Sequence, residues 1–375
     1  MRKKIFIFLT LIISILVVYL FTYFFIFLNL EKYLHPAFTD KESTFFYKNN
    51  SQIVNHLKQP EILIGKNKNV NEYIFSYISD NKKNEVILFQ GDSWFQQVYE
   101  YESATLFLKD NLEKNYTTVN AGSLSYSPSL MSVQLTLLKN KFDIKPNYLV
   151  AYIDQTDIGD ENCRYKFLKK YDSNNKLIAV PYEEYPTQRD VVNPDIYIQN
   201  SNIALNEGNK FTKTYLYISY KVEKFFIKLK KNYKRKILNE NFSGHCPFKK
   251  IQEPLTRYKV SEINYFKSSL IEYLNKAEKD KNIKKIFIVT HPHKKHIFEK
   301  KFVVDVSDIV AEVLQQYPKI SHINFSKKIK DNQKLYDNLN NIWLDDEVHL
   351  KEKYLVKVFL FELVKDLKKS LKYIN

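Results

Sequence analysis

The stretch Val86-Ile87-Leu88-Phe89-Gln90-Gly91-Asp92-Ser93 joins a wholly apolar run to a short polar turn. A continuous apolar run of this length is typical of a strand buried on both faces, as in a parallel sheet. A helical pattern begins directly afterwards, near Phe95. The sequence therefore predicts a strand, a turn and a helix, with the Ser93 hydroxyl at the carboxyl edge of a sheet.

Short apolar runs of the same kind recur along the chain and are separated by helical patterns. The further predicted strands are Tyr116–Val119, Tyr148–Ile153, Ile286–Val289 and a weaker Ile320–Phe325. The predicted helices include Ser129–Asn140, Ser261–Lys279, Val306–Gln316 and Lys351–Leu371. Strands that alternate with helices favour an α/β sandwich with right-handed crossovers, in which ligands bind outside the carboxyl ends of the strands.

The chain starts with Met1-Arg2-Lys3-Lys4, followed by an almost uncharged run from Ile5 to Leu30. A helix rises about 1.5 Å per residue, so roughly 20 residues cross a bilayer core of about 30 Å. The positive charges before the run place the N-terminus in the cytoplasm, and no small-residue cleavage pattern follows the run. We expect residues 5–30 to form an uncleaved single-pass anchor, with the remainder periplasmic or otherwise extracytoplasmic.

Three regions are predicted: residues 1–31 as cytoplasmic N-terminus and anchor, 32–84 as a stalk or lead-in, and 85–375 as the α/β domain with an insertion at about 159–257. The basic stretch from Lys210 to Asn239 either packs its aromatic side chains on the main domain or meets lipid head groups. Cys163 and Cys246 would lie in an oxidising compartment, where they either pair or remain separate thiols.

The formal net charge of the 375-residue chain is +16. The excess is mostly Lys scattered among Asn, Ile and Tyr, which favours general solvation of the surface over a nucleic-acid patch. An anionic membrane surface or an acidic glycan is an equally available partner. We predict no nucleic-acid partner, and the oligomeric state is left open.

A second polar motif, Trp343-Leu344-Asp345-Asp346-Glu347-Val348-His349-Leu350, lies just before the last predicted helix. A serine hydroxyl is a poor nucleophile near neutral pH and needs a base within hydrogen-bonding reach. Histidine suits that role because its pKa lies near neutral pH. An acid three residues earlier can hold the ring in one tautomer and stabilise the imidazolium. The two motifs together predict a triad of Ser93, His349 and Asp346.

Gly91-Asp92-Ser93 on the first strand and Asp346-x-x-His349 before the last helix resemble the SGNH/GDSL hydrolase family of serine esterases. The resemblance covers roughly Glu85 to the C-terminus, without the insertion. It implies a flavodoxin-like three-layer α/β/α sandwich with a parallel sheet. It also implies that Ser93 is the nucleophile, that Asp346 and His349 are the acid and the base, and that no cofactor is needed.

The second motif of the family is altered in this chain. The family has a glycine whose backbone N–H enters the oxyanion hole, and Ser125 stands at that place in the segment 120–126. Ser125 can still donate its backbone N–H if the turn tolerates a Cβ atom. Gly122 is a competing alignment.

The third motif of the family is also altered. Its asparagine, which donates a further oxyanion hydrogen bond, is replaced by Thr156 in Asp154-Gln155-Thr156-Asp157, and Gln155 is the alternative donor. The resemblance thus implies an oxyanion hole formed by Ser93, Ser125 and Thr156. Loss of one such donor lowers turnover by roughly 10²–10³.

Residues that follow Ser93 and the fourth strand are candidates for the walls of a substrate cleft. Trp94 either walls the acyl or sugar pocket or packs the first helix against the insertion. His291 and His293 lie in Thr290-His291-Pro292-His293-Lys294-Lys295-His296, which is either a cleft-lining loop or a metal site with His296. The lysines between the histidines disfavour a cation, so no metal is predicted.

These features predict a membrane-anchored ester hydrolase that removes or transfers O-acyl groups, such as acetyl, on envelope or surface glycans. Water and a sugar hydroxyl are interchangeable acceptors for an acyl-enzyme, so an O-acetyltransferase would use the same residues. The prediction that the substrate is a glycan rests on the anchor and the family resemblance alone. The alternatives are a non-catalytic SGNH-like protein that binds glycan or assembles an envelope complex, and a metal-dependent phosphoesterase using the His291–His296 loop.

Overall fold

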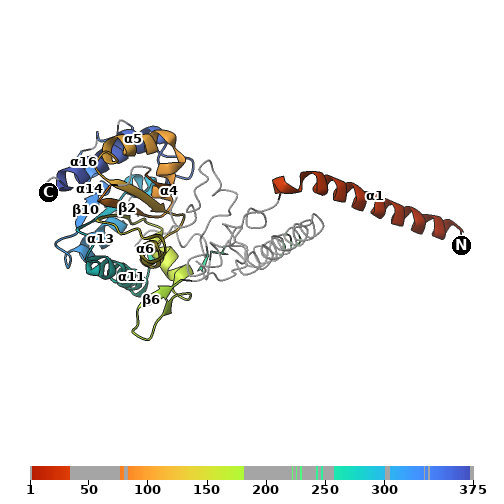
Figure 1. Cartoon of the computed structure of the whole chain (residues 1–375), viewed down its shortest axis with the longest axis horizontal. Coiled ribbons are helices and arrows are strands. Elements are labelled where there is room, and N and C mark those ends of the chain that lie inside the picture. The colour runs from red at the N-terminus through yellow and green to blue at the C-terminus, as the bar shows by residue number, and fades with distance from the viewer. Residues whose placement is uncertain are drawn as a thin grey trace.

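The computed structural model describes residues 2–33, 77–79, 83–180, 257–299, 305–332, 334–336 and 338–371, together with 222, 225, 229, 242–243 and 246–247. Most of these residues form one α/β domain with a central sheet (Figure 1). Each parallel strand of the described residues between 86 and 371 is followed by at least one helix.

The sheet has six strands in the order β1-β3-β2-β4-β9-β10. Five are mutually parallel: β2 (Val86–Gly91), β3 (Thr117–Gly122), β4 (Tyr148–Tyr152), β9 (Lys285–Thr290) and β10 (Ser321–Asn324). They confirm the predicted parallel sheet, and their order is that of a doubly wound, flavodoxin-like sheet. The winding direction reverses between β2 and β4, which is where ligands bind in such sheets.

Helices cover both faces of this sheet (Figure 1). One face packs on α6 (Pro128–Phe142), α11 (Val260–Lys279) and α13 (Val306–Leu314). The other packs on α4 (Ser93–Glu100), α5 (Glu102–Leu112), α14 (Phe325–Asp331) and the C-terminal segment made of η7 (Leu355–Leu360) and α16 (Phe361–Leu371). The four predicted helices are present, and the last is divided into α15 (Glu352–Tyr354), η7 and α16.

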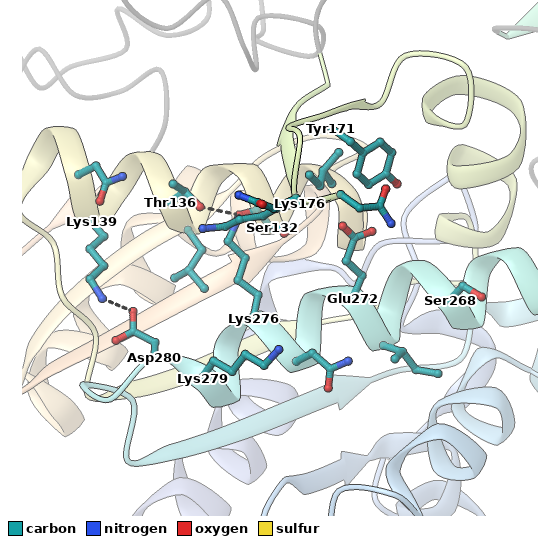
Figure 2. Close-up of a pocket in the computed structure, with 17 residues that line it drawn as sticks. Ser132, Thr136, Lys139, Tyr171, Lys176, Ser268, Glu272, Lys276, Lys279 and Asp280 are labelled. Atoms are coloured by element: carbon teal, nitrogen blue, oxygen red, sulfur yellow. Dashed lines mark hydrogen bonds and ion pairs between the residues drawn. The ribbon is translucent and has the colours of Figure 1, made fainter.

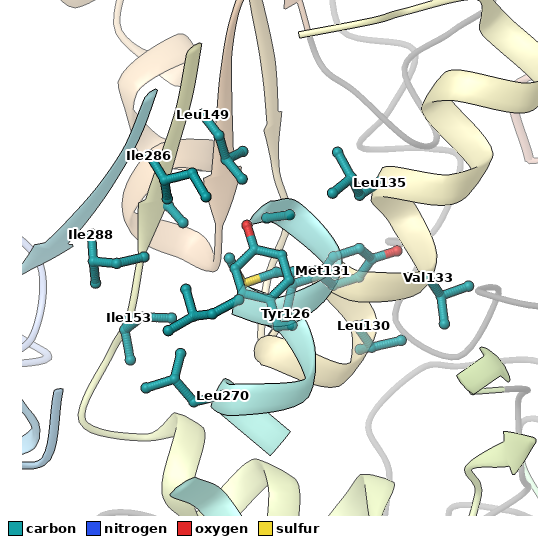
Figure 3. Close-up of a cluster of buried hydrophobic side chains, with 14 of the residues drawn as sticks. Tyr126, Leu130, Met131, Val133, Leu135, Leu149, Ile153, Leu270, Ile286 and Ile288 are labelled. Atoms are coloured by element: carbon teal, nitrogen blue, oxygen red, sulfur yellow. The ribbon is translucent and has the colours of Figure 1, made fainter. Parts of the chain in front are cut away.

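Successive residues of a strand point to opposite faces of the sheet, so their side chains pack into two separate hydrophobic cores. Leu149, Ile286 and Ile288 meet Tyr126 and Met131 on the α6 and α11 side (Figure 3). Ile87, Phe89, Val150 and Phe287 point to the α4 and α16 side. All of these side chains are almost completely buried, which explains why the strands are continuous apolar runs.

Two predicted boundaries differ from the structure. The short β1 (Tyr77–Ile78) pairs antiparallel with β3, so the sheet begins inside the range 32–84 assigned to a lead-in. The predicted insertion begins with α7 (Asp157–Asp160), η3 (Glu161–Tyr165) and the hairpin β5 (Lys170–Tyr171) and β6 (Leu177–Ala179), whose apolar side chains belong to the core of the domain. Its first part is therefore core structure rather than a separate cover.

The remainder of the insertion is described only in part. The prediction for the basic stretch 210–239 lies outside the described residues, except for positions 222, 225 and 229. The short strands β7 (Phe242–Ser243) and β8 (Cys246–Pro247) form an antiparallel pair. Cys163 is disulfide-bonded, and the chain contains two cysteines in all.

The N-terminal residues form α1 (Arg2–Tyr33), a helix of 32 residues (Figure 1). Side chains are described for residues 6–21, and apolar ones among them are exposed, for example Phe6 at 72% and Phe21 at 74%. Within the described residues, no helix combines the length and apolar character needed to cross a membrane.

The turn after β2 depends on two glycines that sit against neighbouring backbone. Gly91 has a φ of +153°, and a Cβ atom there would lie 2.8 Å from Cβ of Tyr152. A Cβ atom at Gly122 would lie 2.5 Å from the backbone N of Gln96 and 2.6 Å from Cβ of Phe95. The first turns of α4 therefore pack directly on the end of β3.

We predict that Gly122→Ala lowers the free energy of unfolding by about 1–3 kcal/mol, because α4 must move away from β3 to admit the methyl group. Urea unfolding followed by the fluorescence of the buried Trp94 and Trp343 measures the change. Leu124→Ala is the control, since this exposed side chain of the same loop should change stability by no more than about 0.5 kcal/mol. Equal stability of Gly122→Ala and the parent chain would contradict the close approach.

Candidate active site

Ser93 is the first residue of α4 and lies at the carboxyl end of β2, beside the point where the sheet reverses its winding. Asp92 caps this helix, because its carboxylate accepts a hydrogen bond from the Trp94 N–H at 3.0 Å. The structure thus places the Ser93 hydroxyl at the carboxyl edge of the sheet, next to the positive end of a helix dipole.

The predicted acid and base lie on a closed loop between α14 and the C-terminal helices. Trp343 and Leu350 form an isolated antiparallel bridge at its base. The Leu344 N–H donates to the His349 carbonyl at 2.8 Å, and Glu347 adopts a positive φ of 59° at the tip. This hairpin-like closure fixes the backbone on both sides of His349.

The loop brings the three predicted triad residues into one chain of hydrogen bonds. Ser93 Oγ lies 2.7 Å from His349 Nε2, and His349 Nδ1 lies 2.5 Å from Asp346 Oδ2. Because Asp346 can only accept when ionised, Nδ1 carries the proton and Nε2 is the acceptor for the serine hydroxyl. This arrangement can take a proton from Ser93 and stabilise the resulting imidazolium.

The local backbone holds Asp346 in its charged form. Its Oδ1 accepts hydrogen bonds from the N–H groups of Val348 at 2.9 Å and His349 at 3.0 Å. Partial burial acts to raise the pKa of Asp346, but the hydrogen bonds from the His349 ring and from the two backbone N–H groups outweigh it and lower the pKa to about 2. The carboxylate is therefore ionised throughout the neutral range.

Gln97 connects the serine helix to the histidine loop. Its side-chain amide donates to the Leu350 carbonyl at 3.0 Å, and the side chain is buried. Leu350 directly follows His349, so the contact fixes α4 relative to the histidine across 253 positions of sequence. Gln97 was not among the predicted site residues, because a glutamine one helical turn after a serine carries no recognisable pattern.

Of the two alignments for the second motif, the structure gives Ser125 the glycine-like backbone. Ser125 has a φ of 60°, a left-handed conformation that favours glycine, and its carbonyl accepts a hydrogen bond from the Tyr165 hydroxyl at 2.6 Å. The N–H of Gly122 instead donates to the Asn120 side chain at 3.1 Å. The absence of a side chain at Gly122 is explained by α4 packing. The oxyanion role of Ser125 stays a prediction.

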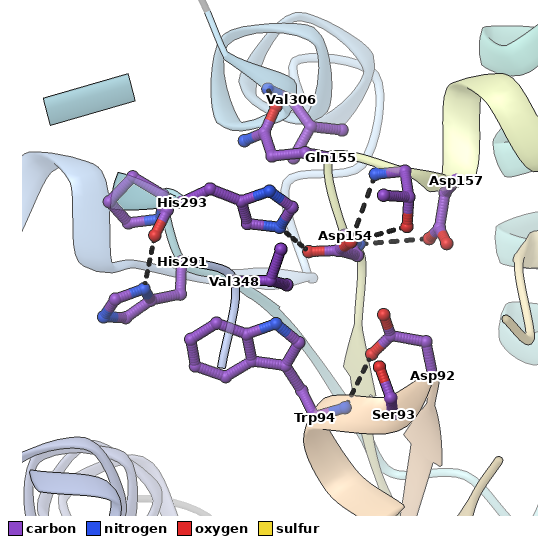
Figure 4. Close-up of polar contacts among 12 residues, drawn as sticks. Asp92, Ser93, Trp94, Asp154, Gln155, Asp157, His291, His293, Val306 and Val348 are labelled. Carbon is purple, nitrogen blue, oxygen red and sulfur yellow. Dashed lines mark hydrogen bonds and ion pairs between the residues drawn. The ribbon is translucent and has the colours of Figure 1, made fainter. Parts of the chain in front are cut away.

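The two candidates of the third motif both make contacts within the protein. The Thr156 hydroxyl donates to Asp154 Oδ2 at 2.6 Å, and its N–H donates to the same oxygen at 3.1 Å. A hydroxyl has one proton, so in this arrangement Thr156 has none to offer an oxyanion. Gln155 accepts from the Val306 N–H at 2.9 Å, on the far side of Asp154 from Ser93 (Figure 4).

Asp154 also forms a buried pair with His293. His293 Nε2 lies 2.7 Å from Asp154 Oδ1, and both side chains are at most 9% exposed. Burial acts to raise the pKa of Asp154, but the attraction and hydrogen bond of His293 and the two hydrogen bonds from Thr156 hold it well below its usual range. His293 was predicted to line the substrate cleft, and its ring is instead engaged with this carboxylate (Figure 4).

Asp154 belongs to a group of buried acids behind Ser93. Burial, followed by repulsion from Asp154, raises the pKa of Asp92 well above its usual range. Burial and the repulsion of Asp92 and Asp154 do the same for Asp157. Burial raises the pKa of Asp160 to about 7, although the ion pair with Arg164 opposes it. Within this group the pKa of Asp154 is lowered, whereas the pKa values of its three buried neighbours are raised.

Two predicted cleft residues lie in the core. Trp94 and His291 are both 0% exposed, with ring centroids 4.7 Å apart. His291 Nε2 lies 2.9 Å from the Tyr336 hydroxyl, and burial lowers its pKa to about 3. The prediction that these two side chains line a substrate pocket is corrected accordingly, since each is covered by aromatic neighbours. Within the described part of the chain, no three His, Cys, Asp or Glu side chains are arranged to hold a metal ion.

No family model matches the chain, and no curated protein matches it. Solved structures that resemble it include a catalytic mutant of an acetylxylan esterase from Geobacillus stearothermophilus, with a TM-score of 0.35 and 11% identity over 76% of this chain and 96% of that one. A lipase from a goat rumen metagenome has a TM-score of 0.36 and 11% identity, covering 76% and 97%. An α/β hydrolase from the metagenome of Lake Arreo, Spain, has a TM-score of 0.36 and 9% identity, covering 76% and 95%. These are distant similarities.

The lowered pKa of Asp346 makes a testable contribution to stability. The folded pKa of about 2 lies below the ordinary value of 3.8, so the contribution is fully present above about pH 4 and is lost as the pH falls towards 2. We predict that Asp346→Asn lowers the free energy of unfolding by about 1 kcal/mol near neutral pH, a value reduced by solvent screening of this half-exposed pair. Unfolding curves of both chains at a series of pH values measure it. A difference that stays constant down to pH 2 would rule out the ionised pair as its cause.

Proposed function

We propose that this chain is a serine ester hydrolase of the SGNH type. The observation that carries the proposal is the hydrogen-bonded sequence Ser93 Oγ, His349 Nε2, His349 Nδ1 and Asp346 Oδ2, at the carboxyl end of β2. Each partner stands at a hydrogen-bonding distance from the next without any movement of the backbone. The base is held in the tautomer that accepts the serine proton, which is the requirement for an activated hydroxyl.

The reaction proceeds in two halves. Ser93 Oγ attacks the ester carbonyl carbon while His349 Nε2 takes the hydroxyl proton, and the carbonyl oxygen becomes an oxyanion. The intermediate collapses as His349 returns the proton to the departing alkoxide, leaving an acyl group on Ser93. A water molecule then attacks the acyl carbon with His349 again as base, which releases the carboxylic acid and restores the hydroxyl.

Backbone N–H groups are the oxyanion donors in this proposal. Ser93 begins α4, so its N–H points out of the helix end, and the glycine-like backbone of Ser125 supports it as the second donor. Thr156, whose hydroxyl donates to Asp154, adds no third side-chain bond. Loss of such a bond lowers turnover by roughly 10²–10³ and leaves the reaction type unchanged.

The proposed substrate is an O-acylated glycan of the cell envelope or surface, and the proposed location is outside the cytoplasm on a membrane anchor. The uncharged run from Ile5 to Leu30 and the exposed apolar side chains of residues 6–21 support the anchor. Transfer to a sugar hydroxyl in place of water would make the same chain an O-acetyltransferase. Acetate release measured with and without an added acceptor sugar, together with acetylation of that sugar, separates the two reactions.

A fluorophosphonate probe on the full chain in detergent tests the nucleophile. We predict labelling of the parent chain, none of Ser93→Ala, and unchanged labelling of Ser103→Ala, a matched control whose exposed hydroxyl donates to Glu352 at 2.5 Å. Hydrolysis of a small acetyl ester should fall about 10⁴-fold in His349→Ala. If the parent chain is not labelled at Ser93, or hydrolyses the ester no faster than Ser93→Ala, the esterase proposal fails and the non-catalytic glycan-binding alternative takes its place.

Carbonate extraction of membranes from the native host tests the anchor. The full chain should stay with the membrane, whereas Leu16→Arg with Val17→Arg should move it largely to the soluble fraction, because each central arginine costs about 2.5–3.5 kcal/mol of insertion. Leu106→Arg, at an exposed leucine of the α/β domain, is the control and should remain bound. Complete extraction of the unaltered chain would show that residues 5–30 are not an anchor.

A further inference from the structure

A second hollow lies between α6, α11 and the hairpin of β5 and β6, with a volume of about 1160 Å³ (Figure 2). It reaches Asn140 and Asp280, at the ends of the two helices that lead back to the start of β4 and β9. Ser93 lies at the opposite, carboxyl edge of the sheet. The hollow is therefore separate from the proposed triad and needs its own explanation.

The hairpin of β5 and β6, which forms one side of the hollow, packs on α6 and α11. Leu177 is buried in the core on the α6 and α11 side. Glu272 on α11 lines the hollow together with Tyr171 and Leu177 of the hairpin. In the turn, the Asp172 carboxylate accepts from the N–H groups of Asn174 and Lys176, both at 2.9 Å. The backbone that carries Lys176 is thus fixed at the rim of the hollow.

Four lysines line the hollow, and three of them have no ion pair. Lys139 is paired with Asp280 at 2.7 Å. For Lys176, Lys276 and Lys279, the described residues provide no carboxylate within ion-pair distance. Lys276 instead donates to the Ser132 carbonyl at 2.6 Å. An excess of positive charge therefore lines a concave surface. This shape concentrates the positive electrostatic potential and attracts anions.

Lys176 and Lys276 are close enough to repel each other. Burial and then this repulsion, partly opposed by Glu272, lower the pKa of Lys276 to about 8. Two like charges brought close together raise the electrostatic free energy of the protein while no anion lies between them. An anionic group between them would remove that repulsion and gain two charge-assisted hydrogen bonds.

The remaining lining is suited to hydroxyl groups. Asn174, Asn175 and Asn275 offer amide donors and acceptors around the lysines, and the Tyr171 ring is 43% exposed at the rim. The volume exceeds that of pockets for single small ligands, which run to about 1,000 Å³. The combination of amides, an exposed ring and lysines in an open groove fits a chain of sugars or polyols that carries negative groups.

We propose that this hollow binds a segment of an acidic glycan, with carboxylate or phosphate groups at Lys176, Lys276 and Lys279 and hydroxyl groups at the surrounding amides. The site goes beyond the proposed esterase and does not depend on Ser93. A chain held there keeps the protein on a polymer while the triad at the other edge of the sheet remains open.

Fluorescence anisotropy with the full chain in detergent tests the site. The probes are fluorescein-labelled hexagalacturonate, which carries carboxylates, a hexameric glycerol phosphate, which carries phosphates, and neutral maltohexaose. At least one acidic probe should bind about tenfold more tightly than maltohexaose, and the tighter of the two identifies the anionic group. Binding should be equal in Ser93→Ala, so a failure of the esterase proposal leaves this result readable.

Two lysine variants locate the binding. Lys176→Gln with Lys276→Met should lower the affinity for the acidic probe about tenfold, and Lys176→Gln alone, at an exposed position, should lower it about threefold. The rate of hydrolysis of a small ester should stay unchanged in both variants. Lys109→Gln with Lys327→Gln makes the same charge change at exposed positions of α5 and α14, on the other layer, and should change binding by less than about twofold. Equal weakening by both pairs, equal binding of maltohexaose, or tighter binding of an oligothymidylate than of either acidic glycan would overturn the proposal.

Discussion

The close approach of α4 to the ends of β2 and β3 determines the position of everything else in the candidate site. Gly122 allows it, because a Cβ atom there would lie 2.5 Å from the backbone N of Gln96 and 2.6 Å from Cβ of Phe95. The helix that starts at Ser93 is then fixed on the sheet, and Gln97 on the same helix holds the loop of His349 through the Leu350 carbonyl. The distance between nucleophile and base is thus set by backbone packing rather than by the flexible side chains themselves.

The parts of the structure that follow from local pattern were predictable. The five parallel strands are continuous apolar runs because helices cover both of their faces, and that pattern is visible without any contact information. The carboxyl ends of parallel strands share one edge, so the polar residues after β2 and β4 were expected together. Ser93 and His349 were paired on their chemistry, and the structure brings them to 2.7 Å.

The parts that depend on long-range side-chain contacts were not predictable. The pair of His293 and Asp154 joins residues 139 positions apart, and neither neighbourhood suggests the other. Trp94 and His291 were expected at a cleft because they adjoin polar motifs, yet their rings pack on each other in the core. The edge strand β1 has two residues, too few to show a period. In each case the residues that come into contact are determined by tertiary packing, which the local sequence pattern does not reveal.

The sequence separation of Ser93 and His349, 256 positions, has a consequence for how the protein is made. Domains emerge from the ribosome N-terminus first, so the residue with the hydroxyl is synthesised long before its base. Until the segment around Trp343 and Leu350 closes against α4, Ser93 is an ordinary alcohol with no activating partner. An unfinished chain therefore has no base in place to activate Ser93. Under the proposed mechanism, the Ser93 hydroxyl becomes reactive only after the domain has folded completely.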